Sequence, residues 1–228
     1  MLLSNYKSFK AIPPAHESQL PELIVRRLGL QEYQPLFKSM RYLAEHVEPN
    51  RADEIWLLSH KPVYTQGQAG AAEHILEPGN IPVVQIDRGG QVTYHGPGQL
   101  VCYLLLNMRR RKFGVRKLVD VIESTVLRTL SELGIEASTK PKAPGIYVKD
   151  AKIAALGLRI KNGLSYHGLS LNVEMDLKPF AQINPCGFEN LEVVQIADFV
   201  EKRENLLRDV SNSLSNNLLV ELGYMIHY

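Results

Sequence analysis

The sequence lacks the features of a secreted, membrane-spanning or nucleic-acid-binding protein. Its only cysteines are Cys102 and Cys186, which excludes a disulfide framework and favours a reducing cytoplasm. No apolar run approaches the roughly 20 residues that span a bilayer, and residues 1–10 lack the apolar stretch of a signal peptide. The 26 basic and 24 acidic residues leave a net charge of +2, too small to predict a nucleic-acid partner.

The chain also lacks the common signatures of metal and nucleotide sites. No Cys/His spacing typical of zinc occurs. The dinucleotide fingerprint is absent, and no Gly-Lys-Ser/Thr follows a glycine-rich loop to bind phosphate. Hydrophobic residues nevertheless make up 45% and charged residues 22%, which predicts a globular domain with a substantial core.

The hydrophobic pattern predicts a single α+β domain over residues 20–228. Residues 1–19 are polar and indicate a poorly ordered leader or an expression extension. We expect strands at 22–28, ended by Gly29, at 53–59 and 82–86, both buried, and at 100–106. Two hairpins are expected, one joining 145–148 to 152 and one joining 152–160 to 164–173 through Asn162-Gly163. Because the predicted strands and helices do not alternate regularly along the sequence, their order favours a mixed sheet over a parallel one.

Helical spacing predicts three helices. The first begins near Pro35, a residue suited to a first turn. The second ends at Gly134, where a C-terminal cap is expected. Its buried face is expected to comprise Val115, Leu118, Val119, Ile122, Val126, Leu130 and Leu133, and the last helix should bury Leu207, Val210, Leu214 and Leu218.

The segment 88–99 holds four glycines in twelve positions. Such a backbone can approach a ligand closely and expose amide donors. The alternative is a glycine-rich hairpin that binds nothing. Arg88, Tyr94, His95 and Gln99 favour the ligand site, because polar residues are costly to concentrate between two apolar strands.

This segment, from Arg88 to His95 and on to Gln99 and Tyr103, resembles the signature of lipoyl(octanoyl) transferases. Three further segments agree with that family in order and spacing, namely 143–148, 152–159 and 183–187. The resemblance covers about residues 21–200. Several long motifs in one chain make it far more specific than a lone glycine pattern.

The resemblance implies a single α+β domain with a mixed sheet and flanking helices, shared with the catalytic domains of biotin and lipoate protein ligases. It implies an acyltransferase that moves octanoyl from octanoyl-acyl carrier protein to a lysine of lipoyl domains. Those domains belong to 2-oxoacid dehydrogenases and the glycine cleavage H protein, and lipoyl-acyl carrier protein is a further candidate donor. No ATP, metal, nucleic acid or membrane is implied.

The same resemblance assigns roles to individual residues. Cys186 would carry the acyl group as a thioester, and Lys152 would support it. Substrate contacts are expected from Arg88, Gly89, Gly90, Gln91, Val92, Thr93, Tyr94, His95, Ala155, Leu156, Gly157, Gly168, Leu169 and Ser170.

Local chemistry is compatible with these roles. Asn184-Pro185 before Cys186 and Gly187 after it indicate a tight turn that can project a thiol, whereas Cys102 lies in an apolar strand and should pack. A thiol with an ordinary pKa of about 8.5 needs a basic neighbour at neutral pH. Lys152 would share a strand face with apolar residues, and desolvation there would lower its pKa. An exposed lysine at a strand end is the alternative.

Other roles stay open at this level. Gly89, Gly90 and Gly157 could line the acyl channel and donate amides to the thioester oxygen. His95 could be a base, an anchor or a structural residue, and positioning is favoured because Lys152 already supplies a base. For His167, the sequence likewise does not distinguish a functional role from a structural one.

Three other classes of protein compete with this interpretation. An ATP-dependent lipoate or biotin ligase of the same fold would catalyse ATP–pyrophosphate exchange and would not need Cys186. A non-catalytic scaffold for lipoyl domains or acyl carrier protein would be indifferent to Cys186→Ser. A cysteine hydrolase would usually pair its nucleophile with histidine rather than lysine.

Overall fold

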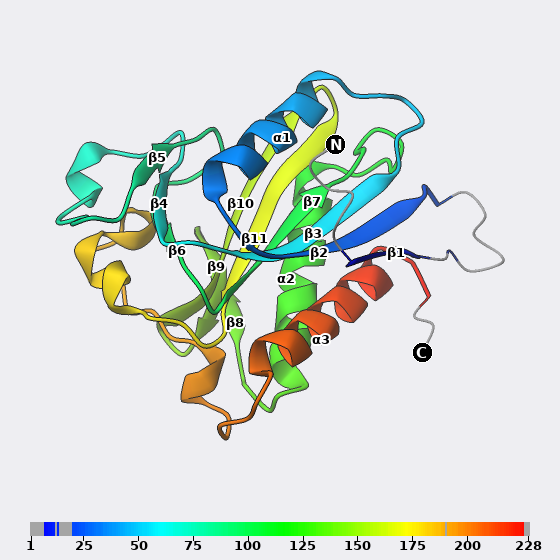
Figure 1. The fold of residues 1–228 in the computed structure, drawn as a ribbon. Coiled ribbons are helices and arrows are strands. Elements are labelled where there is room, and N and C mark those ends of the chain that lie inside the picture. Colours follow the sequence, from blue (N-terminus) through cyan, green and yellow to red (C-terminus); the bar gives the residue numbers. More distant parts are fainter. Residues whose placement is uncertain (1–6, 12, 14–19, 190, 226–228) are drawn as a thin grey trace.

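A computed structural model describes residues 7–11, 13, 20–189 and 191–225. Its main sheet has eight strands in the order β1-β2-β3-β7-β11-β10-β9-β8, all antiparallel to their neighbours except the parallel pair β2–β3 (Figure 1). In chain order these strands are β1 (Lys7–Ala11), β2 (Leu23–Gln31), β3 (Asp53–His60), β7 (Gln99–Leu105), β8 (Ser138–Lys140), β9 (Ala143–Val148), β10 (Ala151–Lys161) and β11 (Leu164–Asn172). A smaller sheet has the order β5-β4-β6, from β4 (Val63–Gln66), β5 (Val83–Gln85) and β6 (Val92–His95).

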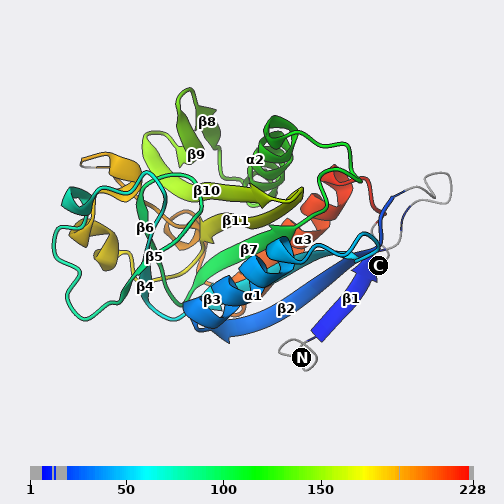
Figure 2. The ribbon, with the colours of Figure 1, turned by 90° about the horizontal axis from the view of Figure 1, so that it is seen from above.

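Three helices cover the two faces of the main sheet. Helix α1 (Tyr33–Glu45) lies on one face, and α2 (Val115–Ser131) and α3 (Leu206–Glu221) pack together on the other (Figures 1 and 2). Short 3₁₀ turns occur at η1 (Ala72–His74), η2 (Lys178–Gln182), η3 (Pro185–Gly187) and η4 (Ile196–Asp198). Within the part of the chain that the structure describes, no helix has the length and apolarity to cross a bilayer.

The central strand β7 is buried on both faces, which explains its nearly continuous apolar sequence. Cys102 and Leu104 belong to the core formed with α2 and α3, whereas Val101, Tyr103 and Leu105 belong to the core under α1. Successive side chains of a strand point to opposite faces, so one strand serves both cores.

The predicted helix and hairpin boundaries are largely confirmed. Leu118, Ile122, Val126 and Leu130 of α2 are fully buried, whereas Val115, which the sequence predicts on the same face, is 54% exposed because it begins the helix. Gly134 has φ +74° where the chain leaves the helix. Strands β10 and β11 are joined by Asn162-Gly163, both with positive φ, as a two-residue turn requires. A second two-residue turn, Lys149-Asp150, joins β9 to β10.

Several sequence-based expectations are wrong. Residues 7–11 of the predicted leader form β1, which pairs with β2 in antiparallel register. The rest of that leader, apart from residue 13, lies outside the described residues. Gly29 does not end the first strand; it sits at a bulge inside β2 with φ +66°. Val83 is 41% exposed, because β5 lies at the edge of the small sheet.

A buried carboxylate at the start of β3 connects distant parts of the chain. Asp53 accepts hydrogen bonds from the amide of Asn107 at 2.8 Å, from Arg110 Nη2 at 2.8 Å and from Arg111 Nε at 2.5 Å. Arg111 in turn donates to the hydroxyl of Tyr224 at 2.8 Å. The network ties the loop after β7 to the segment after α3.

We expect Asp53→Asn to lower the free energy of unfolding by about 3–5 kcal/mol, because it leaves the buried Arg111 guanidinium without a balancing charge. Asp209→Asn on the exposed surface of α3 is the matched control and should change stability by less than about 1 kcal/mol. Urea unfolding of the three proteins measures the difference. An unchanged midpoint for Asp53→Asn would show that this network contributes no stability.

Candidate active site

Cys186 lies in a strained turn that the surrounding chain holds in place. It has φ +58° and ψ 15°, a left-handed conformation that costs energy for a residue with a side chain. The turn closes through hydrogen bonds from the amide of Gly187 to the carbonyl of Asn184 at 3.0 Å and from Phe188 to Pro185 at 3.1 Å. The amide of Asn184 donates to the carbonyl of His74 at 2.8 Å, which anchors the turn to η1. Strain of this kind is typical of functional positions.

The side chain of Lys152 reaches the thiol of Cys186. Its Nζ donates to Sγ at 3.0 Å and to the carbonyl of Pro144 at 3.1 Å, and it lies 5.2 Å from the centre of the Tyr147 ring. Lys152 is only 4% exposed. No carboxylate of the described residues pairs with it, so a thiolate at Cys186 is the anion available to balance its charge.

The pKa of Lys152 moves in the opposite direction from the predicted one. Burial alone would lower the pKa of this ammonium. The charge of Cys186, the hydrogen bond to it and the smaller contributions of Tyr147 together outweigh burial, so the pKa is raised above its ordinary value. Lys152 therefore stays protonated beside the sulfur, at a distance from which an ammonium can stabilise an anion on that atom.

The backbone around Lys152 directs its side chain toward Cys186. The pairing of β10 with β9 shifts register between Lys152 and Ala154, and such a bulge re-aims a side chain. The amide of Lys152 donates to Glu192 O at 2.8 Å, and its carbonyl accepts from Val194 at 3.0 Å. A Cβ at Gly145 would lie 2.9 Å from Lys152 Cε, so the missing side chain there leaves room for the lysine.

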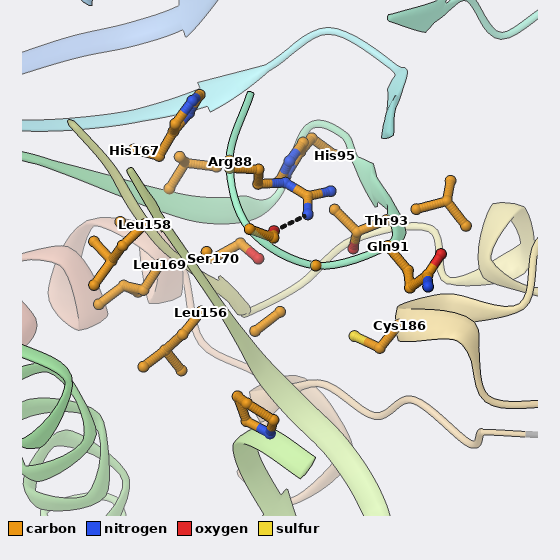
Figure 3. Close-up of a pocket in the computed structure, with 18 of the residues that line it drawn as sticks. Arg88, Gln91, Thr93, His95, Leu156, Leu158, His167, Leu169, Ser170 and Cys186 are labelled. Carbon is orange, nitrogen blue, oxygen red and sulfur yellow. Dashed lines mark hydrogen bonds between the residues drawn. The ribbon is translucent and has the colours of Figure 1, made fainter. Parts of the chain in front are cut away.

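Cys186 and Lys152 stand at one end of a cavity of about 400 Å³. In Figure 3, Cys186 lies at one end, whereas Leu156, Leu158 and Leu169 gather at the other. The lining residues that the sequence predicted are Arg88, Gly89, Gly90, Gln91, Val92, Thr93, His95, Lys152, Ala155, Leu156, Gly157, Gly168, Leu169, Ser170 and Cys186. Thirteen of the fourteen predicted contact residues thus surround one space, together with the dyad Cys186–Lys152.

Tyr94 is the exception. Its ring faces away from the cavity and packs against Tyr64 and Phe180, each at a centroid distance of 5.5 Å. The alternation of β6 explains the difference, because Thr93 and His95 line the cavity while Tyr94 between them points to the opposite side. Tyr94 is therefore a packing residue, and the prediction that it contacts substrate is not supported by its placement.

Arg88 carries a buried positive charge into the cavity. Its guanidinium donates to the carbonyls of Gly89 at 2.9 Å and Thr65 at 2.8 Å and to the Thr65 hydroxyl at 3.1 Å (Figure 3 shows the first). Burial lowers its pKa, and no described carboxylate forms an ion pair with it. A Cβ at Gly157 would lie 2.8 Å from Arg88 Cδ, so this glycine lets the arginine cross β10.

The glycines of the cavity do not all have the predicted role. The amide of Gly89 donates to Leu158 O at 3.2 Å, so it is not a free donor for a thioester oxygen. A Cβ at Gly168 would lie 2.1 Å from Cys102 O, which assigns that glycine to close strand packing. Gly90 has φ +86°, a conformation that disfavours any residue with a side chain, so the backbone alone explains why a glycine is present here.

The two histidines at the cavity are held by hydrogen bonds to neighbouring side chains. His95 bonds through Nδ1 to Gln99 Oε1 at 2.7 Å and through Nε2 to the Thr65 hydroxyl at 3.3 Å. Burial lowers the pKa of His95 to about 3, which supports positioning rather than general acid chemistry at neutral pH. His167 bonds to Asp87 at 3.1 Å, and burial likewise lowers its pKa.

Sequence patterns missed several residues of the cavity wall, which are Tyr33, Val101, Tyr103, Lys142, Pro144, Leu158 and Phe188. Strand alternation could have indicated Val101 and Tyr103, which share a face of β7. Nothing local marks Tyr33 or Phe188, because tertiary packing brings them to the site. Across the described residues, no group of three or more His, Cys, Asp and Glu side chains is arranged to hold a metal ion.

Solved structures of low sequence identity share this fold. Protein Ta0514 of T. acidophilum, described as a lipoate protein ligase and bound to lipoic acid, superposes with a TM-score of 0.69 at 16% identity, covering 87% of this chain and 85% of that one. Lipoate-protein ligase A bound with ATP also has a TM-score of 0.69, at 17% identity, covering 86% and 85%. The predicted α+β fold of lipoate protein ligases is confirmed.

Curated relatives are much closer in sequence. An octanoyltransferase of Hahella chejuensis is 59% identical over 183 residues, or 80% of this chain and 82% of the relative. One of Ectopseudomonas mendocina is 55% identical over 90% of this chain and all of the relative, and one of Escherichia coli is 54% identical over 89% and 94%. Residues 32–218 also match the lipoyl protein ligase A/B catalytic domain. The chain therefore belongs to the family of lipoyl protein ligase A/B catalytic domains.

Proposed function

We propose that this protein is an octanoyltransferase that carries the acyl group as a thioester on Cys186. The observation that carries the proposal is the 3.0 Å contact between Lys152 Nζ and Cys186 Sγ at one end of a largely apolar cavity. Relatives that are 54–59% identical bear the name octanoyltransferase, which supports the same activity here.

In the first step the thiolate of Cys186 attacks the carbonyl carbon of the donor thioester. A new C–S bond forms, the donor C–S bond breaks, and the donor sulfur leaves as a thiolate that takes up a proton. Lys152 stabilises the attacking thiolate before the step, because its buried ammonium lies at hydrogen-bond distance.

In the second step the amine of an acceptor lysine attacks the same carbonyl carbon. The C–N bond of an amide forms, the bond to Cys186 breaks, and a proton leaves the amine. The cysteine returns as a thiolate beside Lys152, so one pair of residues serves both steps.

The energy for the reaction arrives with the substrate, which makes ATP and a metal ion unnecessary in this proposal. Exchange of one thioester for another is nearly balanced, and the amide is more stable than either. The leucines at the far end of the cavity would hold the octanoyl tail, at about 0.8 kcal/mol for each buried CH₂ group. Selection between neighbouring chain lengths is therefore modest for each carbon.

The proposed partners are octanoyl-acyl carrier protein as donor and lipoyl domains of 2-oxoacid dehydrogenases and of the glycine cleavage H protein as acceptors. A cytoplasmic location suits the mechanism, because Cys186 must remain a reduced thiol and both cysteines are free. An ATP-dependent ligase of the same fold would catalyse ATP–pyrophosphate exchange, which we expect to be absent.

Incubation with octanoyl-acyl carrier protein should add the mass of one octanoyl group to the protein, removable by hydroxylamine. Cys186→Ala should add none, because the nucleophile is lost. Cys102→Ala should still be acylated, since burial raises the pKa of Cys102 to about 12 and keeps it unreactive. Intact-mass spectrometry measures all three, and an adduct that persists in Cys186→Ala would contradict the mechanism.

Lys152→Met should move the pH midpoint of iodoacetamide labelling at Cys186 upward by about one unit or more, because a charge-assisted hydrogen bond to the sulfur is lost. Lys149→Met, at an exposed turn nearby, is the control and should leave the midpoint unchanged. Superimposable labelling curves for wild type and Lys152→Met would show that another group activates the thiol.

Substitution of Gly89 and Gly90 distinguishes a glycine that leaves room for the substrate from a glycine that its backbone conformation requires. Gly89 has an ordinary φ, and an added Cβ would meet only Leu158 O at 3.8 Å, so Gly89→Ala should fold normally. Since the methyl group would enter the cavity, acylation should slow by roughly tenfold. Gly90→Ala should instead lose about 1–2 kcal/mol of stability because of its φ of +86°. Melting temperatures and acylation rates measured together test both, and normal acylation of Gly89→Ala would place the substrate elsewhere.

A further inference from the structure

Acyl transfer through Cys186 places a negative charge on the carbonyl oxygen of the acyl group. When a thiolate adds to a thioester, this oxygen becomes an oxyanion, and hydrogen-bond donors aimed at it lower the barrier. The backbone amides of Gly89, Gly187 and Phe188 already donate to carbonyls of the chain. These three amides are therefore not free to stabilise the oxyanion, and a donor has to come from another group near the sulfur.

The side chain of Gln91 lies against the turn that carries Cys186. Gln91 and Cys186 line the same cavity, and Figure 3 shows the Gln91 amide next to Cys186. A Cβ at Gly187 would lie 3.0 Å from Gln91 Cγ and 3.4 Å from its Cδ. The glycine that follows the nucleophile thus leaves the space in which the glutamine approaches the turn.

One hydrogen bond fixes the orientation of the Gln91 amide. Its Oε1 accepts from the backbone amide of Ala71 at 3.1 Å. Because a backbone N–H can only donate, the side-chain oxygen must face Ala71 and the NH₂ group must face away from it. Among the described residues, none accepts a hydrogen bond from Gln91 Nε2. The amide is held in one direction and still has both of its N–H donors.

Thr93 and Lys152 also bring donors to this end of the cavity. Thr93 lines it, but no hydrogen bond to a described residue fixes the direction of its hydroxyl. Lys152 Nζ already donates to the sulfur of Cys186 at 3.0 Å and to the carbonyl of Pro144 at 3.1 Å. Since a donor is most effective when its direction is set before the reaction, Gln91 fits the role better than either.

We propose that Gln91 is a catalytic residue whose Nε2 donates a hydrogen bond to the oxyanion of the acyl group. The inference rests on the proposed function. As the thiolate of Cys186 adds to the carbonyl carbon, the electron pair of the C=O π bond moves to the oxygen, which accepts from Nε2. The pair returns when the donor C–S bond breaks, so Gln91 neither gains nor loses a proton. The same hydrogen bond forms again when the acceptor amine adds to the acyl-enzyme.

The test compares two reactions of the same thiolate. Transfer of octanoyl from octanoyl-acyl carrier protein passes through an oxyanion, whereas alkylation by iodoacetamide displaces iodide at a saturated carbon and forms none. The measured quantity is the single-turnover rate constant of acylation at saturating donor, divided by the rate constant of alkylation at the same pH. Intact-mass spectrometry follows both reactions. The quotient is insensitive to changes in the reactivity of the Cys186 thiol.

Gln91→Met removes both the donor and the bond to Ala71, and we expect the quotient to fall by about 10²- to 10³-fold, the effect of losing one oxyanion donor. Gln91→Glu keeps an oxygen that can accept from Ala71 but has no N–H, so its quotient should fall at least as far. Gln68→Met is the control, because Gln68 is exposed, accepts from Arg159 at 2.8 Å and does not line the cavity. Its quotient should equal that of the wild type.

An unchanged quotient in Gln91→Met would overturn the assignment, and a fall in Thr93→Val instead would give the oxyanion to that hydroxyl. A fall in Gln91→Met that Gln91→Glu does not share would also overturn it, because the bond to Ala71 would then be the important contact. Failure of octanoyl-acyl carrier protein to acylate wild-type Cys186 is a different result, which would overturn the proposed function and the assignment of Gln91 together.

Discussion

The ammonium of Lys152 is buried at a place where no carboxylate among the described residues balances it, and the site is built around that constraint. A charge removed from water is costly unless other groups replace the solvent. Here the replacements are the sulfur of Cys186, the carbonyl of Pro144 and the face of the Tyr147 ring. These groups come from η3 and β9, so the charge is stabilised only when both segments are in place against β10. The contacts that stabilise the buried ammonium also hold it at hydrogen-bond distance from the sulfur of Cys186.

Several backbone irregularities follow from that constraint. The bulge at Lys152 turns the side chain toward the cavity. The backbone amide and carbonyl of Lys152 bond to the segment 192–194 instead of to β9. Cys186 adopts a left-handed conformation although it is not glycine. None of these features stabilises a sheet or a turn by itself. Each lowers the free energy of unfolding locally, and the apolar burial in the two cores on either side of β7 must offset that loss.

Sequence patterns predicted the parts of this structure whose causes are local. The turn at Asn162-Gly163, the cap at Gly134 and most of the buried face of α2 depend on residues close together in the chain, and they are confirmed except at Val115, which is exposed. Motif resemblance located the cavity wall, because its residues lie in a few short segments. Long-range contacts set what the patterns missed: β1 needs β2 as a partner, Tyr94 follows the pleat of β6, and the amide of Gly89 bonds to β10. The pKa of Lys152 depends on a sulfur that is 34 positions away.

The opposing effects on Lys152 have a consequence for the order of events in the proposed reaction. Its pKa is high because an anionic sulfur outweighs burial. Once Cys186 carries an acyl group, the sulfur has no negative charge, and burial is opposed only by Tyr147 and the Pro144 carbonyl. The ammonium then becomes more acidic, at the stage when the attacking amine has a proton to lose. After the proton has been passed on and the thioester has broken, the returning thiolate makes the lysine basic again. A single buried pair would thus change its protonation with each half of the cycle, without any movement of the chain.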